Sequence, residues 1–88
     1  MKTTITKQFI KKASKLKDKK LRVTIFAVIQ EIELIDSISE IRNMEKLRGH
    51  EFAYRIRIGK YRIGVFIKND IVEFSTFDHR SKIYKIFP

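Results

Sequence analysis

The hydrophobic period of the chain changes near residue 53, and this change constrains the fold more than any other feature. Upstream, apolar residues recur every three or four positions, as in an amphipathic helix. Downstream, apolar and polar residues alternate in three runs separated by two-residue turns, which predicts antiparallel strands with one buried face. We expect the strands over residues 53–58, 61–68 and 71–77, with turns at Gly59-Lys60 and Asn69-Asp70.

The upstream part predicts a short strand followed by two helices. The strand is expected over residues 2–6, and Thr6 can cap a first helix over about residues 7–16. Asp18 can cap a second, longer helix, whose apolar stripe recurs at intervals of three and four residues up to Ile35. The two helices are expected to form an antiparallel hairpin.

These elements predict one α+β domain over residues 1–88. An N-terminal strand and a two-helix hairpin are expected to pack on an antiparallel β-sheet of about four strands. Residues 37–52 are expected to form a loop with one helical turn, and residues 80–87 a short helix or an extended segment. The 88 residues, 43% of them hydrophobic, suffice for a single hydrophobic core.

The Gly59-Lys60 turn sets the register of the first two strands, so that Arg57 stands opposite Arg62. One face of the sheet is then apolar and is expected to pack on the helices: Tyr54, Ile56, Ile58, Tyr61, Ile63, Val65, Ile67, Val72, Phe74 and Thr76. The opposite face gathers three arginines: Ala53, Arg55, Arg57, Arg62, Gly64, Phe66, Glu73, Ser75 and Phe77.

Two arginines directly opposite one another destabilise a sheet unless something compensates for their charge. We favour a bound anion, such as a phosphate, between Arg57 and Arg62. The alternatives are neutralisation by Glu73 or a loop carboxylate, or splaying of the side chains into water.

The charge of the chain also indicates a polyanionic partner. The net charge is +10, and residues 1–22 carry nine Lys or Arg against Asp18 alone. Such a field attracts polyanions, so nucleic acid is favoured over an anionic membrane surface, an acidic protein or a merely solvated helix face. We expect Lys11, Lys12 and Lys15 to contribute to this binding. Without a membrane-spanning stretch or a signal peptide, the chain is expected to be cytoplasmic and not to bind membranes.

A second group of candidate residues follows the last predicted strand. If the alternation continues from Phe77, His79 points to the arginine face, and a helical turn would bring Arg80 and Tyr84 onto one side. The predicted site therefore contains Arg55, Arg57, Arg62, His79, Arg80 and Tyr84.

Arginines, one imidazole and one phenol suit metal-free RNA cleavage, in which the 2′-hydroxyl attacks the adjacent phosphate. Arginine stabilises the charged phosphorane, histidine transfers a proton near neutrality, and an aromatic ring stacks on an unpaired base. The chain has no cysteine, and its two histidines and ten carboxylates show no metal-ligand spacing. We therefore expect neither a metal nor a cofactor.

Three segments, in this order and spacing, resemble the RelE/ParE toxin superfamily and its RelE branch in particular. They are Lys46-Leu47-Arg48-Gly49, Tyr54-Arg55-Ile56-Arg57-Ile58-Gly59-Lys60-Tyr61-Arg62-Ile63-Gly64 and His79-Arg80-Ser81-Lys82-Ile83-Tyr84. The resemblance covers nearly the whole chain. It implies a RelE-like α+β fold, cleavage of messenger RNA in the ribosomal A site, and a cognate antitoxin that is acidic, apolar and partly disordered when free.

The resemblance also implies roles for individual residues. Arg55, Arg57 and Arg62 would contact the scissile phosphate, Arg80 and Tyr84 would complete the site, and Lys46 and Arg48 would bind substrate. Well-studied RelE proteins have lysine where Arg55 and Arg57 stand, and a guanidinium cannot act as a general base at neutral pH. Glu45 resembles in position a carboxylate that some relatives use, which makes it a weak candidate for the base.

Two other functions remain open at this point. A ParE-like chain would inhibit DNA gyrase without cleaving RNA, and a catalytically silent chain would only bind RNA. Arg62, His79, Arg80 and Tyr84 together favour RelE-like cleavage.

Overall fold

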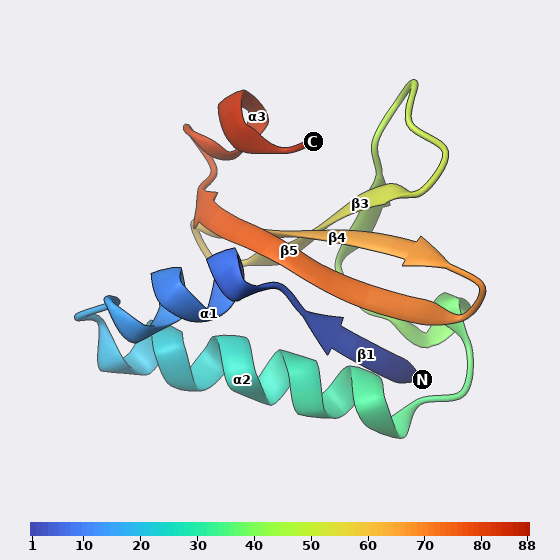
Figure 1. Ribbon diagram of the computed structural model, residues 1–88, viewed down its shortest axis with the longest axis horizontal. Coiled ribbons are helices and arrows are strands. Elements are labelled where there is room, and N and C mark those ends of the chain that lie inside the picture. The colour runs from blue at the N-terminus through green and yellow to red at the C-terminus, as the bar shows by residue number, and fades with distance from the viewer.

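The computed structural model describes residues 1–88 and has the predicted α+β arrangement (Figure 1). Its elements are β1 (Lys2–Ile5), α1 (Lys7–Ser14), α2 (Lys19–Leu34), the 3-10 helix η1 (Ile38–Glu40), β2 (Met44–Lys46), β3 (Ala53–Ile58), β4 (Tyr61–Lys68), β5 (Ile71–His79) and α3 (Ile83–Ile86). The strands form one sheet in the order β1-β5-β4-β3-β2. Helices α1 and α2 cover one face, whereas α3 and the β2–β3 loop rise from the other (Figure 1).

The sheet differs from the prediction in two respects. It has five strands rather than about four, because Met44–Lys46, expected in a loop, pairs antiparallel with β3. Three residues are too few for an alternation to be recognised. The sheet is also mixed rather than antiparallel, since β1 runs parallel to β5. The long path from β1 through both helices supplies the crossover that a parallel pair requires.

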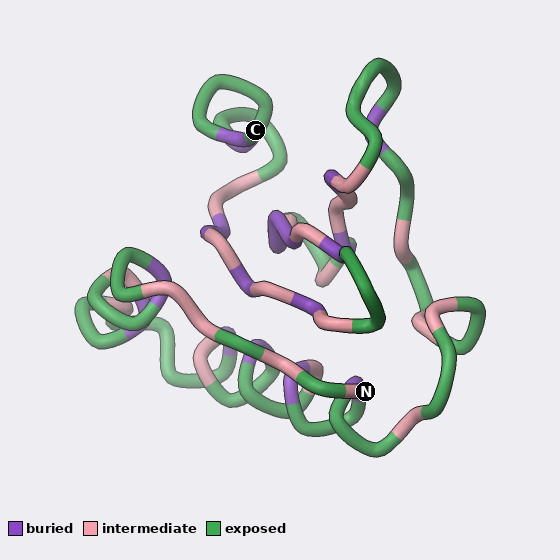
Figure 2. The backbone as a smooth tube through the Cα atoms, turned by 45° about the vertical axis from the view of Figure 1, so that its right-hand side comes forward, coloured by how far each residue is buried: buried purple, intermediate pink, exposed green.

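Both predicted helix caps are present. The Thr6 side chain accepts a hydrogen bond from the Phe9 N–H at 3.1 Å, and the Asp18 side chain accepts one from the Leu21 N–H at 3.0 Å. These bonds satisfy backbone donors that have no partner within the helix. The helices run in opposite directions, and their buried positions face the strands (Figure 2).

The predicted hairpin turns and the register of β3 against β4 are confirmed. Arg57 stands opposite Arg62, and Arg55 opposite Gly64. Gly59 has φ +60°, and both residues of the Asn69-Asp70 turn also have positive φ. The apolar face of β3 and β4 packs on Phe9, Ala13 and the buried stripe of α2 in a core of 13 buried residues.

The predicted faces of β5 are wrong beyond Phe74, because a β-bulge interrupts the alternation. Val65 pairs with Phe74, but the neighbouring Gly64 pairs with Thr76, so Ser75 is the extra residue. An extra residue moves all later side chains to the other face.

The side chains after the bulge, including Thr76, Phe77 and His79, therefore lie on the opposite face of the sheet from the one predicted. Phe77 belongs to the core under the helices, where its ring centroid lies 5.2 Å from that of Phe9. Thr76 is buried opposite Gly64 on the arginine face. His79 stands opposite Tyr61, with their ring centroids 5.6 Å apart, and does not point to the arginine face.

A second, smaller core lies on the arginine side of the sheet. Its buried members are Leu47, Ala53, Ile83 and Phe87, with Phe66 packed against them. Phe87 fills the space beside Gly64: a Cβ atom at this position would lie 2.5 Å from the Phe87 ring. This contact holds the C-terminal segment, including α3, against the sheet.

Gly64→Ala is expected to destabilise the fold by about 1–3 kcal/mol, the usual cost of overpacking, because Phe87 has to move. Urea denaturation of Gly64→Ala, Phe87→Ala and the double variant measures the coupling between the two positions. With Phe87 removed, the added methyl no longer clashes, so the two losses should not add. Additive losses would show that the ring does not occupy this space in solution.

Candidate functional site

Three arginines line one hollow on the face of the sheet opposite α1 and α2. Arg55 and Arg57 come from β3, and Arg62 comes from β4. With Asn43, Met44 and Glu45 they line a cavity of about 290 Å³. The cross-strand register predicted this grouping, and we call it the arginine cavity.

Few hydrogen bonds within the chain engage the three guanidinium groups. Arg57 Nη2 donates to Asn43 Oδ1 at 3.3 Å. Arg62 Nη1 donates to the carbonyls of Gly59 and Tyr61 at 3.0 and 2.9 Å. Arg55 Nε is buried without a partner. Each guanidinium has five N–H donors, so donors remain free for a ligand.

No carboxylate lies within ion-pair distance of these arginines. The two ion pairs of the chain join Lys12 to Asp78 and Arg42 to Glu31. Glu73, considered above as a counterion, stands opposite Phe66 instead. The three guanidinium groups of the arginine cavity therefore share it with one carboxylate, Glu45, and form no ion pair with it, which favours the bound-anion interpretation of the Arg57–Arg62 pair.

A second hollow, of about 370 Å³, continues from the arginine cavity and shares Glu45 and Arg55 with it. Its walls come from the β2–β3 loop and the C-terminal segment: Leu47, Arg48, His50, Tyr84, Phe87 and Pro88. Tyr84 is 61% exposed and can offer a ring face to a flat group.

His50 is the functional candidate that the sequence analysis did not assign. It lies in an irregular loop, where no period predicts the direction of a side chain. The only available signal was its position directly after the Lys46–Gly49 segment.

Other predicted site residues lie outside the two hollows. His79 lies beside Tyr61, and its Nδ1 is 2.9 Å from the Ser81 hydroxyl. Arg80 lies in the turn after β5, and its backbone N–H donates to the Lys60 carbonyl at 2.8 Å. Lys46 stands opposite Tyr54, a residue of the apolar face.

The lysines of the N-terminal segment lie on the helix side of the sheet. Lys11 and Lys12 belong to α1, and Lys15 is its C-cap. The Lys12 ammonium lies 3.1 Å from a carboxylate oxygen of Asp78, a residue that stands opposite Arg62 in the sheet. Lys12 thus contacts β5, the neighbour of β4 in the sheet.

Asp78 is held in its charged form. Partial burial by itself would raise its pKa, but a hydrogen bond from the His79 backbone N–H and the nearby Lys12 ammonium outweigh burial. The pKa of Asp78 therefore lies below its ordinary value of 3.8.

This lowered pKa predicts how stability depends on pH. The stabilisation from ionised Asp78 is fully present above its unfolded pKa of about 3.9 and is lost as the pH falls through the lower, folded pKa. Asp78→Asn keeps the backbone hydrogen bond but removes the charge. The difference in melting temperature between wild type and Asp78→Asn should be constant near neutrality and disappear in acid. A difference that does not decrease as the pH falls below the ordinary pKa of 3.8 would contradict this explanation.

No three His, Asp or Glu side chains lie together in a way that could hold a metal ion. No helix is both long and apolar enough to cross a membrane.

Known proteins resemble the chain over its full length. The toxin RelE3 of Methanocaldococcus jannaschii is 33% identical over 89 residues, which covers 100% of both chains. A chain of the RelB–RelE antitoxin–toxin complex from Methanococcus jannaschii has a TM-score of 0.80 at 30% identity, covering 97% of this chain and 99% of that chain. No family model matches the sequence.

More distant structures share the fold. A chain of the RelE–RelB complex from Pyrococcus horikoshii has a TM-score of 0.72 at 21% identity, covering 92% of this chain and 96% of that one. A chain of the Escherichia coli RelBE complex has a TM-score of 0.67 at 20% identity, covering 89% and 94%. The full-length identity to RelE3 and the common fold show that the chain belongs to the RelE family of toxins.

Proposed function

We propose that the chain is the toxin of a type II toxin–antitoxin system and cleaves messenger RNA in the ribosomal A site, in the cytoplasm. The observation that carries this proposal is the arginine cavity, in which three guanidinium groups share one hollow with a single carboxylate, Glu45, and form no ion pair with it. An RNA phosphate supplies the missing negative charge.

The proposed reaction uses the RNA as its own nucleophile. The 2′-hydroxyl attacks the adjacent phosphorus and the 5′-oxygen leaves, giving a 2′,3′-cyclic phosphate and a 5′-hydroxyl. Arg55, Arg57 and Arg62 stabilise the negative phosphorane, and Arg80 adds charge at the end of the sheet. The exposed ring of Tyr84 stacks on a base beside the scissile bond.

Two side chains in the hollows are suited to moving the protons. The 2′-hydroxyl has to lose one proton and the leaving oxygen has to gain one. Among the side chains that line the two hollows, only Glu45 and His50 are a carboxylate and an imidazole. We propose Glu45 as the base and His50 as the acid. His79 is the alternative acid, but its ring lies beside Tyr61 on the other face.

Substitutions can separate these assignments. Glu45→Gln and His50→Gln should each slow cleavage by roughly 10²-fold, the lower end of general acid–base effects, and each should remove one limb of the pH–rate profile. His79→Gln is the matched control and should cost less than about tenfold. Single-turnover cleavage on programmed ribosomes, measured across pH, provides the rates. A larger loss for His79→Gln than for His50→Gln would reverse the assignment of the acid.

Further basic residues, in and around the second hollow and on α1, would guide the substrate. We propose that Arg48 and Lys46 contact the message near the site. Lys11, Lys12 and Lys15 belong to the segment with nine Lys or Arg in 22 residues, and they would contact ribosomal RNA through their charge.

We also propose a cognate antitoxin. Similar chains were solved as RelB–RelE complexes, and this chain offers an uncompensated basic surface and exposed apolar side chains to a partner. An acidic segment that folds on binding can cover both kinds of surface.

Primer extension on translating ribosomes with the purified chain tests this function. Cleavage that depends on the ribosome and ends in a 5′-hydroxyl supports it. A chain that leaves messages intact but blocks DNA supercoiling by gyrase would instead be ParE-like, and one that binds RNA without either effect would be a silent binder. A protein encoded by a neighbouring reading frame that suppresses cleavage by the chain would be the proposed antitoxin.

A further inference from the structure

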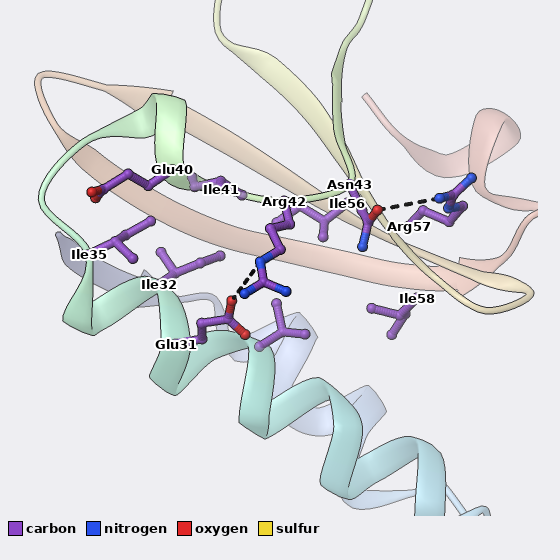
Figure 3. Close-up of a pocket in the computed structure, with 11 residues that line it drawn as sticks. Glu31, Ile32, Ile35, Glu40, Ile41, Arg42, Asn43, Ile56, Arg57 and Ile58 are labelled. Atoms are coloured by element: carbon purple, nitrogen blue, oxygen red, sulfur yellow. Dashed lines mark hydrogen bonds and ion pairs between the residues drawn. The ribbon is translucent and has the colours of Figure 1, made fainter.

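A small pocket lies between α2, β3 and the segment that contains η1, and nothing above assigns it a role (Figure 3). Its volume is about 140 Å³. The apolar lining consists of Val28, Ile32, Ile35, Ile41, Ile56 and Ile58. We call it the isoleucine pocket.

The pocket has the size of one large apolar side chain. A dry engineered cavity of roughly 150 Å³ lined by apolar residues binds benzene. The natural occupant would therefore be a single Leu, Ile, Met or Phe side chain rather than a cofactor, since small-molecule sites usually exceed about 300 Å³.

The charged residues that line the pocket are Glu31, Glu40, Arg42 and Arg57. The Glu40 carboxylate accepts hydrogen bonds from the backbone N–H groups of Asp36 and Ser37, and the Arg57 guanidinium donates to Asn43. The remaining two are weakly paired. Arg42 Nε lies 3.9 Å from a Glu31 carboxylate oxygen, and the two side chains are 84% and 58% exposed. An ion pair so long and so exposed contributes little stability. Arg42 is thus free to exchange Glu31 for a carboxylate of a partner.

The isoleucine pocket adjoins the arginine cavity through Asn43 and Arg57, which line both. The Arg57 backbone N–H donates to the Asn43 carbonyl at 2.9 Å, and the guanidinium donates to the Asn43 side chain at 3.3 Å. Figure 3 shows this second bond, with the Arg57 guanidinium directed away from the isoleucines. A chain that inserts a side chain into the pocket would therefore pass close to Arg57.

We propose that the isoleucine pocket takes one large apolar side chain of the antitoxin, next to an acidic residue that pairs with Arg42. This inference rests on the proposed toxin–antitoxin function and names where the partner is anchored. Nucleic acid offers no aliphatic group for the apolar floor. A second copy of the chain carries the same net charge of +10, so the two copies would repel one another. An acidic protein segment suits both the floor and the rim.

The chemistry of the pocket can be tested on the free chain with a probe, N-acetyl-leucyl-glutamate amide. Binding of the probe should shift the methyl NMR signals of the isoleucines that line the pocket: Ile32, Ile35, Ile41, Ile56 and Ile58. N-acetyl-leucinamide, which lacks the glutamate, should bind more weakly than the probe at low salt and about equally well at high salt. Val28→Phe should fill the pocket and reduce binding by about tenfold or more. Val23→Phe, the same change at a 60% exposed position of the same helix, should leave binding unchanged. Equal effects of the two variants on binding of the probe, or no shift of these methyl signals, would contradict binding in the isoleucine pocket.

Charge reversal tests the rim. Arg42→Glu should weaken binding of the probe. Lys17→Glu changes the net charge by the same amount at a position far from Arg42 in the sequence, and it should leave binding of the probe unchanged. In the complex with the toxicity-suppressing protein the probe should no longer bind. If the probe still bound to the isoleucine pocket in this complex, the proposal that the antitoxin occupies the pocket would be contradicted. These measurements involve neither ribosomes nor RNA, so they can fail while cleavage succeeds, and cleavage can fail while they succeed.

Discussion

A message whose scissile nucleotide lacks its 2′-hydroxyl is expected to resist cleavage completely. The side chains that line the two hollows include no serine, threonine or cysteine, and the proposed mechanism assigns Glu45 and His50 to proton transfer and Tyr84 to base stacking. The attacking oxygen of the proposed reaction is therefore the 2′-hydroxyl of the RNA. Primer extension on ribosomes programmed with a message carrying one 2′-deoxynucleotide in the A site measures this.

The control is the same message with the deoxynucleotide one codon downstream, which should be cleaved at the normal rate. A 2′-O-methyl group at the scissile position should block cleavage like the deoxy substitution, because the nucleophile is again missing. Cleavage of the deoxy message at an undiminished rate would require a nucleophile from the protein or from water, and the roles proposed for the arginines would have to be reassigned.

Arg62→Ala is expected to lower the rate of cleavage by about 10²- to 10³-fold, the loss typical of one donor to an oxyanion. Arg62 stands opposite Arg57 and is anchored by the carbonyls of Gly59 and Tyr61, so its guanidinium is held in place before substrate arrives. The substitution should lower the single-turnover rate but change the affinity for the ribosome only slightly. The reason is that Arg62 is one of twenty Lys and Arg residues that together attract the chain to the ribosome.

Two variants make this result specific. Arg62→Lys keeps the charge but loses the bidentate geometry and should recover only part of the rate. Arg42→Ala removes an arginine outside the arginine cavity and should leave the rate unchanged. A loss for Arg42→Ala as large as for Arg62→Ala would indicate that net charge, rather than placement, determines the rate. All three variants should melt cooperatively, which circular dichroism can verify.

The features that follow from local chemistry could be predicted from the sequence. Thr6 and Asp18 cap helices because their side chains reach backbone N–H groups three residues ahead. Gly59 tolerates the positive φ of its turn, and this turn alone places Arg57 opposite Arg62. The grouping of the three arginines is therefore a consequence of one hairpin, whereas the wall formed by Asn43, Met44 and Glu45 comes from β2 and the residue before it.

The features that depend on tertiary packing could not be predicted. The bulge at Ser75 leaves only a weak mark on the alternation: two polar residues, Ser75 and Thr76, stand in succession between Phe74 and Phe77, and Thr76 fits either face of a strand. His79 was consequently assigned to the wrong face of the sheet. The direction of the β2–β3 loop, which brings His50 to the second hollow, follows from the burial of Leu47 against Phe87 across a separation of 40 residues in the sequence.

The second core supports the candidate site separately from the main core. Leu47 and Phe87 line the second hollow, Ile83 is buried with them, and all three lie across the sheet from the main core under the helices. Conservative exchanges among these few side chains would shift Arg48, His50 and Tyr84 relative to the arginines while the main core keeps its packing. If the chain cleaves messages as proposed, a library of substitutions at these few positions is the smallest one in which to look for altered cleavage specificity.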